Sequence, residues 1–513
     1  MDTMTTKSSN SSKGGMRAAV RGGFLLCLCV VLSTPFLFGQ GGGTGAIVGT
    51  VTDNTGAVVA NAAVDVTNTG TGVVQHTQTG SSGDFTLPSL NPGLYSVSVQ
   101  ATGFQKAVTS GVVLTVDQKA RVNISLKPGA VTTTVEVNAT AVTLDTDSSA
   151  LSQLVSQQQV EQLPLNGRNF MQLLLIGAGA VTVGGEQGTM RQGEGAGISI
   201  NGGRPEGNNY TLDGLINTDT ALVTPAVILS QDAIQEFKVE SGTYSAEYGY
   251  SASQINIVSK SGGNQLHGSL FEFNRNDTFD ASPFPTYTDY QTGIPTSNPE
   301  LRQNQFGFVV SGPVYLPKVY DGRNKTFFMA NYEGWRIING ARVSDTVPNP
   351  AVLTGDFSGE TYPAGIGGLP GGPLPNYGTP ACATLLTAGY NCMPVDPLTG
   401  QPFPGNMIPS DRFTARIGLV AVANNFWAAP TVPNQPEGIT NYIKNVGFPL
   451  TTNQQTYRVD QNIGKLGSVF FRYTHSSYQN QSTYNSGDLA HGIEQYFETQ
   501  KNWEISHTIN FGP

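Results

Sequence analysis

From residue 266 to the end of the chain, apolar and polar residues alternate along segments of about ten residues. In the last segment Trp503 and Ile505 share one face, whereas Asn502 and Glu504 share the other. Segments of this length with one apolar and one polar face are typical of a transmembrane β-barrel, although a soluble β-sandwich gives similar alternation. The sequence therefore predicts a mainly β protein whose second half begins an antiparallel barrel. Six strands are expected there, at residues 266–273, 306–311, 326–333, 455–463, 467–474 and 502–511.

The first forty residues have the pattern of an export signal. Lys7, Lys13, Arg17 and Arg21 precede an apolar run at residues 24–38. This run is too short for a membrane-spanning helix, and no later segment reaches ~18 consecutive apolar residues. We expect a cleaved signal peptide over residues 1–40, with an uncleaved anchor helix as the alternative.

Composition and cysteine content limit which partners and metal sites the chain can have. Charged residues make up only 12% of the chain and the formal net charge is −9, so the basic patch typical of nucleic-acid binding is absent and no nucleic-acid partner is expected. Two of the four cysteines lie in the export segment. The others, Cys382 and Cys392, have no histidine nearby, and export favours a disulfide over a metal site. We expect this pair to close a small extracellular loop.

Residues 45–127 contain seven short β-prone segments separated by turn sequences, which predicts a small β-sandwich. The stretches 49–59 and 83–99, followed by Gly103 and Phe104, are similar to the carboxypeptidase-regulatory-like domain. This resemblance implies a prealbumin-like, carbohydrate-binding-like sandwich that holds none of the zinc chemistry of carboxypeptidases. A rigid spacer or folding module is the expected role, with carbohydrate binding as the alternative.

Three blocks between residues 143 and 265, at 157–170, 198–214 and 233–262, look in this order like the plug domain of TonB-dependent receptors. The stretch 163–170 is similar to the Oar-like branch of that family, which also carries the regulatory-like sandwich in front. The first block predicts a short helix that stops before Pro164. The second predicts two paired strands across a Gly-rich loop. The plug motif comprises Asn201, Gly202, Arg204, Asp213, Gly214, Tyr248 and Gly249.

A β-prone run at residues 131–139 lies in the linker 128–142, between the sandwich and the plug-like blocks. It resembles the TonB box, the segment that a periplasmic coupling protein captures by strand addition. An isolated strand suits that role, because its unpaired backbone groups are open to a partner strand. The resemblance implies coupling through Thr134, Val135, Glu136 and Val137, and a plain linker strand is the alternative.

The barrel part, residues 266–513, is interrupted by a Pro- and Gly-rich stretch that we expect to form one long extracellular loop, residues 336–452. Six strands are too few to close a barrel of about 22 strands, the size of plugged outer-membrane transporters. The chain is therefore expected to be part of a longer protein.

Catalytic motifs are not found in the sequence: there is no phosphate-binding loop, zinc-protease helix or nucleophile elbow, and the five histidines are scattered. No enzyme activity, cofactor or metal is expected. The resemblance implies outer-membrane transport gated by a plug, with membrane lipid around the barrel, a TonB-type coupling protein and the sandwich in the periplasm. The external substrate is unidentified, with a glycan or another large ligand as candidates. The alternative is a secreted or surface carbohydrate-binding or adhesive protein that uses the sandwich.

Overall fold

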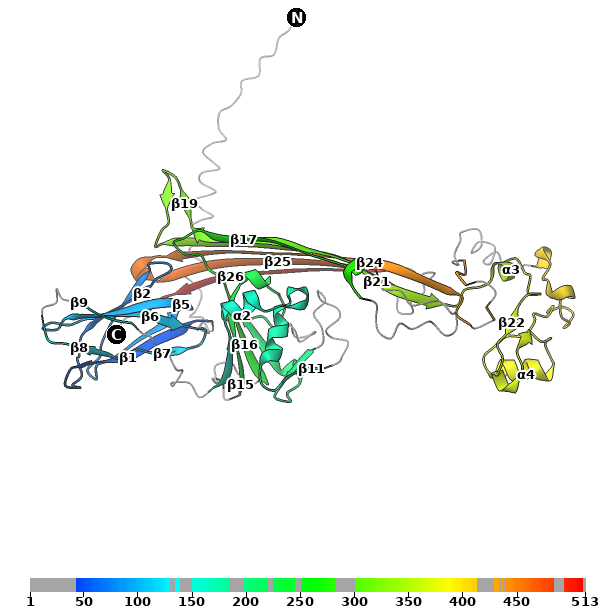
Figure 1. Cartoon of the computed structure of the whole chain (residues 1–513), viewed down its shortest axis with the longest axis horizontal. Coiled ribbons are helices and arrows are strands. Elements are labelled where there is room, and N and C mark those ends of the chain that lie inside the picture. The colour runs from blue at the N-terminus through cyan, green and yellow to red at the C-terminus, as the bar shows by residue number, and fades with distance from the viewer. Residues whose placement is uncertain are drawn as a thin grey trace, which may run out of the picture.

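The computed structural model describes residues 43–129, 134–138, 150–183, 197–219, 225–242, 244, 251–281, 300–412, 429–432, 435–436, 439–483 and 493–510. The expected signal peptide, Tyr248, Gly249 and Phe511 lie outside these residues. A small sandwich, a middle unit and a sheet of long strands follow one another along the chain (Figure 1). No helix of the described residues is long and apolar enough to cross a membrane.

The sandwich has two sheets that share one apolar core. One sheet has the order β4-β1-β7, with β8 also paired to β1, and the other has the order β3-β2-β5-β6-β9. Tyr95, Val97 and Val99 alternate inward along β5 and are buried, as the sequence predicts. Its strands are β1 (Gly45–Asp53), β2 (Ala63–Asn68), β3 (Val74–Gln78), β4 (Asp84–Leu90), β5 (Gly93–Gln100), β6 (Lys106–Leu114), β7 (Lys119–Arg121) and β8 (Ile124–Leu126).

The β-prone run after the sandwich forms strand β9 (Thr134–Asn138), but the strand is not isolated. It pairs in parallel with β6, from Lys106 opposite Thr134 to Ser110 opposite Asn138. The expectation of an unpaired tether was therefore wrong. The reason is physical: β6 offers an edge, and pairing with it satisfies backbone groups that an isolated strand would leave to water.

The middle unit, residues 150–260, is built around a five-stranded sheet of order β10-β15-β16-β13-β14. Helix α2 (Gln157–Gln162) begins at a capping box of Ser156 and Gln159 and ends before Pro164, as expected. Its remaining elements are β10 (Leu151–Val155), η1 (Asn166–Arg168), η2 (Phe170–Ile176), β11 (Ala180–Val183), β12 (Gly197–Ile200), η4 (Pro205–Gly207), β13 (Asn208–Leu212), β14 (Leu215–Ile216), η5 (Gln231–Ala233), β15 (Ile234–Gly242) and β16 (Ser253–Ser259).

One pairing inside the middle unit differs from the prediction. The two strands of the second block, β12 and β13, are not paired with each other: β12 pairs with β11, and β13 lies parallel to β16. The short turn η4, which Pro205 opens, redirects the chain between them. A two-residue hairpin turn would have joined the strands, whereas this longer connection lets each strand find another partner.

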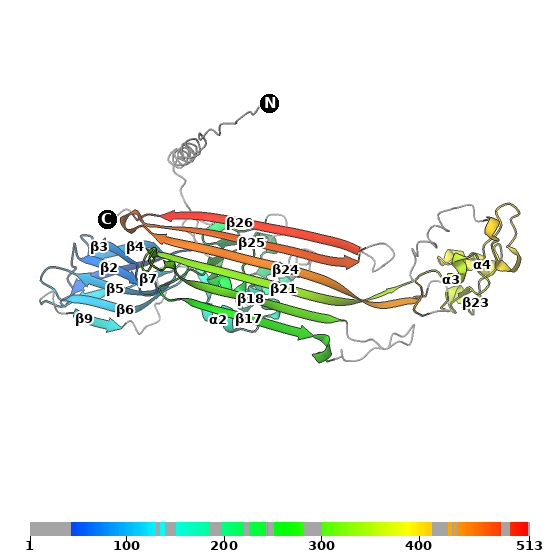
Figure 2. The ribbon, with the colours of Figure 1, turned by 90° about the horizontal axis from the view of Figure 1, so that it is seen from above.

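The long-strand sheet is an antiparallel meander of six strands in chain order (Figure 2). The predicted alternation is confirmed: Arg472 and Thr474 on β25 are buried, whereas Phe471, Trp503 and Ile505 are exposed on the other face. Its strands are β17 (His267–Asn276), β18 (Leu301–Pro313), β21 (Thr326–Asp345), β24 (Tyr442–Asn462), β25 (Ser468–Thr483) and β26 (Ile493–Thr508); β19 (Tyr315–Leu316) and β20 (Tyr320–Asp321) form a small hairpin beside it, and η7 (Asp277–Phe279) and η11 (Gly464–Leu466) follow β17 and β24.

The expected loop over residues 336–452 was wrong at both ends. Strand β21 continues to Asp345 and β24 begins at Tyr442, and these two residues pair directly. Gly340, Gly447 and Pro449 interrupt the apolar alternation in this part of the two strands, so periodicity underestimated their length.

A small distal unit, residues 346–412, lies at the far end of the β21–β24 hairpin (Figures 1 and 2). It has its own buried cluster of Tyr362, Leu374, Leu385 and Met393. The sulfur atoms of Cys382 and Cys392 are bonded to each other, with their Cα atoms 5.6 Å apart. Its elements are α3 (Pro350–Leu353), β22 (Thr361–Tyr362), η8 (Ile366–Gly368), β23 (Gly372–Pro373), α4 (Pro380–Thr387), η9 (Pro404–Asn406) and η10 (Ser410–Arg412).

Candidate functional site

The middle unit lies against the polar face of the long-strand sheet (Figures 1 and 2), and one of its motif residues, Asp213, stands at the contact. Asp213 and Gly214 form the tight turn between β13 and β14, with φ angles of 50° and 94°. A two-residue turn with both φ angles positive favours Asp-Gly, which explains the local sequence. The turn directs the Asp213 carboxylate into the contact, where its side chain is only 3% exposed.

Two arginines from neighbouring long strands hold the Asp213 carboxylate. Arg458 Nη1 on β24 lies 3.1 Å from Oδ1, and Arg472 Nε on β25 lies 2.7 Å from Oδ2. Ser259 of the middle unit also donates to this carboxylate, through its backbone N–H at 2.9 Å and its hydroxyl at 2.7 Å. Every oxygen of the carboxylate therefore has partners from both parts of the protein. We call this group the Asp213 clamp.

Further acidic groups balance the two arginines of the Asp213 clamp. Arg472 Nη2 donates to Glu504 at 2.6 Å, and the Arg458 guanidinium is bonded to Asp460 at 2.9–3.1 Å. Burial would raise the pKa of Asp213, but the positive charges of Arg458 and Arg472 outweigh burial and hold its pKa below the usual range. Asp213 is therefore ionised at neutral pH. Removing one member would leave an uncompensated buried charge, which is costly.

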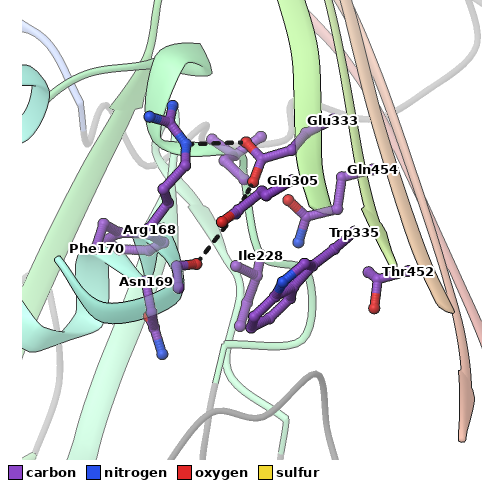
Figure 3. A pocket seen from close by; sticks show the side chains of 11 residues that line it. Arg168, Asn169, Phe170, Ile228, Gln305, Glu333, Trp335, Thr452 and Gln454 are labelled. Carbon is purple, nitrogen blue, oxygen red and sulfur yellow. Dashed lines mark hydrogen bonds and ion pairs between the residues drawn. The ribbon is translucent and has the colours of Figure 1, made fainter. Parts of the chain in front are cut away.

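A second polar contact is made by Arg168, in the turn of the LPLNGRNF stretch. Arg168 is ion-paired with Asp232 of its own unit, and its Nε lies 3.7 Å from Glu333 Oε2 on β21 (Figure 3). Its guanidinium also stacks 4.2 Å from the centre of the Phe271 ring on β17. A charged group that also lies on an aromatic face gains a cation–π attraction. Arg168 therefore connects three elements at once.

Glu333 is the centre of this second contact. It accepts hydrogen bonds from Gln305 Nε2 on β18 and from the hydroxyl of Ser230 in the middle unit, both at 2.5 Å. Beside it, a cavity of about 40 Å³ separates the η1 turn from the long-strand sheet. Gly167, with φ 67°, lines this cavity; a Cβ there would lie 2.9 Å from Trp335 Cη2. Only glycine fits both the backbone conformation and the close approach of the indole.

The remaining described motif residues do not join the Asp213 clamp. Asn201 and Gly202 form an exposed turn after β12, where Asn201 donates to the Ser241 carbonyl oxygen at 3.1 Å. Arg204 is exposed and precedes η4. These three residues and Asp213 lie at opposite ends of β13, so the motif is not one site. Its first part shapes a turn and its last part makes the contact.

The sandwich is also fixed to the middle unit. The Val116 N–H donates to Glu236 Oε1 at 2.5 Å, and Asn256 Nδ2 donates to Asp117 Oδ2 at 2.6 Å. Burial raises the pKa of Asp117 to about 6 and that of Glu236 to about 7. Glu240 adds to the shift of Asp117, and Lys238 opposes it. This contact therefore contains carboxyl groups that titrate close to neutral pH.

Sequence reasoning missed the partners of Asp213. Glu504 was placed on the polar face of its strand, but nothing linked that face to a turn more than 250 residues away. Arg472 is the one Asp, Glu, Lys or Arg residue of β25, and this is the signal that could have marked it, whereas β26 carries several charged residues besides Glu504. The described residues contain no group of three or more His, Cys, Asp or Glu side chains that could hold a metal ion.

Two parts of the chain match known protein families. Residues 258–513 match the family described as Outer membrane beta barrel domain, and residues 46–127 match the Carboxypeptidase regulatory-like domain. The TonB-dependent transporter Oar of Myxococcus xanthus is 27% identical over 328 residues, which are 62% of this chain and 30% of that protein. The outer membrane transporter YddB from Escherichia coli is 10% identical, with a TM-score of 0.40 over 70% of this chain and 37% of that one.

The fold and these matches define an outer-membrane β-barrel protein with a regulatory-like sandwich at its N-terminal side. Within that class, the chain is similar to the TonB-dependent transporter Oar. It spans about a third of the length of the two relatives named above.

Proposed function

We propose that the protein is part of a transporter that moves an unidentified substrate across the outer membrane, and that the middle unit is its plug. A barrel of about 22 strands encloses a lumen too wide for side chains to fill, so a separate unit has to close it. Residues 150–260 would be that unit. Substrate would bind on the external side, and movement of the plug would open the path.

The observation that carries this proposal is the Asp213 clamp. Met329 of β21 packs in the apolar core of the middle unit, but at the Asp213 clamp the contact is charged and hydrogen-bonded between Asp213, Arg458 and Arg472. Such contacts can be exchanged for water when the unit moves, because every group in them is able to bind water. A polar interface is therefore suited to a unit that is held in place and later displaced.

Energy for the displacement would come from a TonB-type coupling protein that binds at β9. Thr134, Val135, Glu136 and Val137 are the proposed contact residues. In favour of this role, β9 is an edge strand located in the chain between the sandwich and the middle unit. Strand addition to such an edge gives affinity through backbone hydrogen bonds, largely independent of side chains.

The test uses the full-length protein in detergent and the purified periplasmic domain of a TonB-type protein. Val135→Pro should abolish their binding, because proline removes a backbone donor and distorts the strand. Val74→Pro, in the edge strand β3 at the opposite side of the same sheet, is the matched control and should leave binding within about twofold of wild type. No binding by the wild-type protein, or equal binding by Val135→Pro, would contradict the proposal.

The competing function, carbohydrate binding or adhesion by the sandwich, predicts a different result. The isolated residues 45–127 would then bind glycans on an array, and the wild-type protein would not bind the coupling domain. No contact among the described residues of the sandwich indicates a sugar-binding site. We therefore keep transport as the proposed function.

A further inference from the structure

Strand β9 is held in the sandwich sheet by a continuous ladder. Its five residues pair in parallel with Lys106 to Ser110 of β6, with no register shift. It is the last strand in the order β3-β2-β5-β6-β9, and β6 is its one partner among the described residues. Figure 2 shows β9 along one side of the sandwich, next to β6.

The outer edge of β9 carries few of the features that normally protect a sheet edge: the strand is short and has one charged residue, Glu136. Natural edge strands carry proline, lysine or a bulge, which prevent another chain from pairing with them. The β9 sequence, Thr-Val-Glu-Val-Asn, has neither proline nor lysine, and its pairing with β6 has no bulge. Because successive residues of a strand direct their backbone groups to opposite edges, about half of these groups face outward.

The opposite edge of the same sheet is in a different situation. Gln75 of β3 accepts a hydrogen bond from Asn510, which follows the last long strand, at 3.0 Å. Strand β3 therefore lies beside the long-strand sheet, where a second protein would meet the barrel. Among the described residues, β6 is the one strand that pairs with β9, so the other edge of β9 is open to a partner strand.

The sandwich also has contacts with the middle unit and with the residues that precede the first long strand. Its Val116–Asp117 turn is bonded to Glu236 and Asn256 of the middle unit. In addition, Asn264, just before the first long strand, donates from its backbone to Gly70 O at 2.9 Å and from its side chain to Thr71 O at 2.7 Å. A force applied to the sandwich would therefore reach the middle unit through contacts that are already formed.

From these observations we infer that the coupling protein adds its strand to the outer edge of β9 while β9 stays paired with β6. The partner surface is then the edge of the whole sandwich sheet, not a released peptide. The sandwich acts as the handle that transmits force to the middle unit. This inference rests on the proposed function, since it specifies how the same partner binds.

Cross-linking β9 to β6 tests the inference. Val108 pairs with Glu136 and Ser110 with Asn138, and register partners on neighbouring strands lie within the Cα separation that a disulfide accepts. Two variants of the full chain are made, Val108→Cys with Glu136→Cys and Ser110→Cys with Asn138→Cys. Each is oxidised or reduced, and binding of the purified periplasmic domain of a TonB-type protein is titrated against both forms.

The oxidised and reduced forms of each variant are expected to bind with the same affinity within about twofold. A loss of about tenfold or more on oxidation, recovered on reduction, would show that β9 has to leave the sheet and would overturn the inference. Failure of both pairs to cross-link would overturn it as well, because β9 would then not be held by β6. The second pair uses none of the four proposed contact residues.

Wild-type protein, measured with and without reductant, is the control for opening the Cys382–Cys392 disulfide. It also separates the two proposals. If the wild-type protein does not bind the coupling domain, the proposed function fails. If the wild-type protein binds and only the oxidised variants do not, the transporter proposal stands. The inference that β9 stays paired with β6 during binding is then wrong.

Discussion

Asp213 shows how one residue can carry the contact between two parts of a chain. Its carboxylate is shared between Arg458 and Arg472, so a neutral replacement leaves two buried arginines without their common anion. Asp213→Asn should lower the free energy of unfolding of the middle unit by about 3–5 kcal/mol. Urea unfolding in detergent, followed by hydrogen exchange of β13 and β16, measures this loss. Arg204→Ala, an exposed change in the same motif, should stay within about 0.5 kcal/mol of wild type.

Gly167 gives a second prediction at this scale. In Gly167→Ala the left-handed backbone costs ~1–2 kcal/mol, and the new Cβ also meets the Trp335 indole. The double variant with Trp335→Ala should be less destabilised than the sum of the two single variants, because the clash is removed while the backbone strain stays. Thermal unfolding of the four proteins measures this coupling, and additive effects would show that the indole does not restrict this position.

The sequence identified Asp213 but not its partners, for a physical reason. The Asp-Gly turn is a local feature, so turn chemistry predicts it directly. Its contacts with Arg458 and Arg472 depend on which strands become neighbours, and period-two alternation reports only which face a residue occupies. Sequence reasoning could therefore place Arg472 on the polar face without identifying the carboxylate it binds.

At the scale of elements, the positions of the long strands were predictable and their lengths were not. Alternation located all six strands, yet β21 and β24 extend well past their apolar segments. In their distal parts the ladder of backbone hydrogen bonds persists, because strand pairing needs no apolar face once it has been started. Strand β9 is a similar case. Its local sequence predicted a strand, but the sequence did not predict that this strand pairs with β6.

The distal unit contains too small an apolar cluster to be stable without help, so its disulfide should matter. Replacing both Cys382 and Cys392 by serine should destabilise residues 346–412 by about 2–3 kcal/mol, the value for closing a short loop. Limited proteolysis should then cut within this unit faster, while the long strands keep their protection. Unchanged cleavage would mean that Tyr362, Leu374, Leu385 and Met393 hold the unit alone.

At the scale of the whole molecule, the docking of the sandwich should depend on pH. The pKa of Asp117 rises to about 6 and that of Glu236 to about 7 in the docked state, so docking retains protons that the separated carboxyls would lose. Docking is then strongest below about pH 4 and weakens as the pH rises to about 7, by at most tenfold per pH unit for each group.

Spin labels at the exposed residues Thr55 and Gln158 can follow this docking by the distance between them. The fraction with the short distance should fall as the pH is raised from about 4 to about 7. Asp117→Asn combined with Glu236→Gln removes both titrating groups and should make the profile flat, while Lys238 and Glu240 stay in place. A wild-type profile that is already flat would contradict the role of the two carboxyls.

The sandwich, the middle unit and the distal unit each have a buried cluster, and these clusters have no residue in common. Heat would therefore disrupt them one after another, as separate cooperative transitions. The same independence has a consequence during secretion. The sandwich precedes the barrel strands in the chain, and its core draws on residues 47–126 alone, so it can finish folding before any barrel strand has left the translocation channel. Its edge at β9 could then form before the barrel strands have crossed the channel.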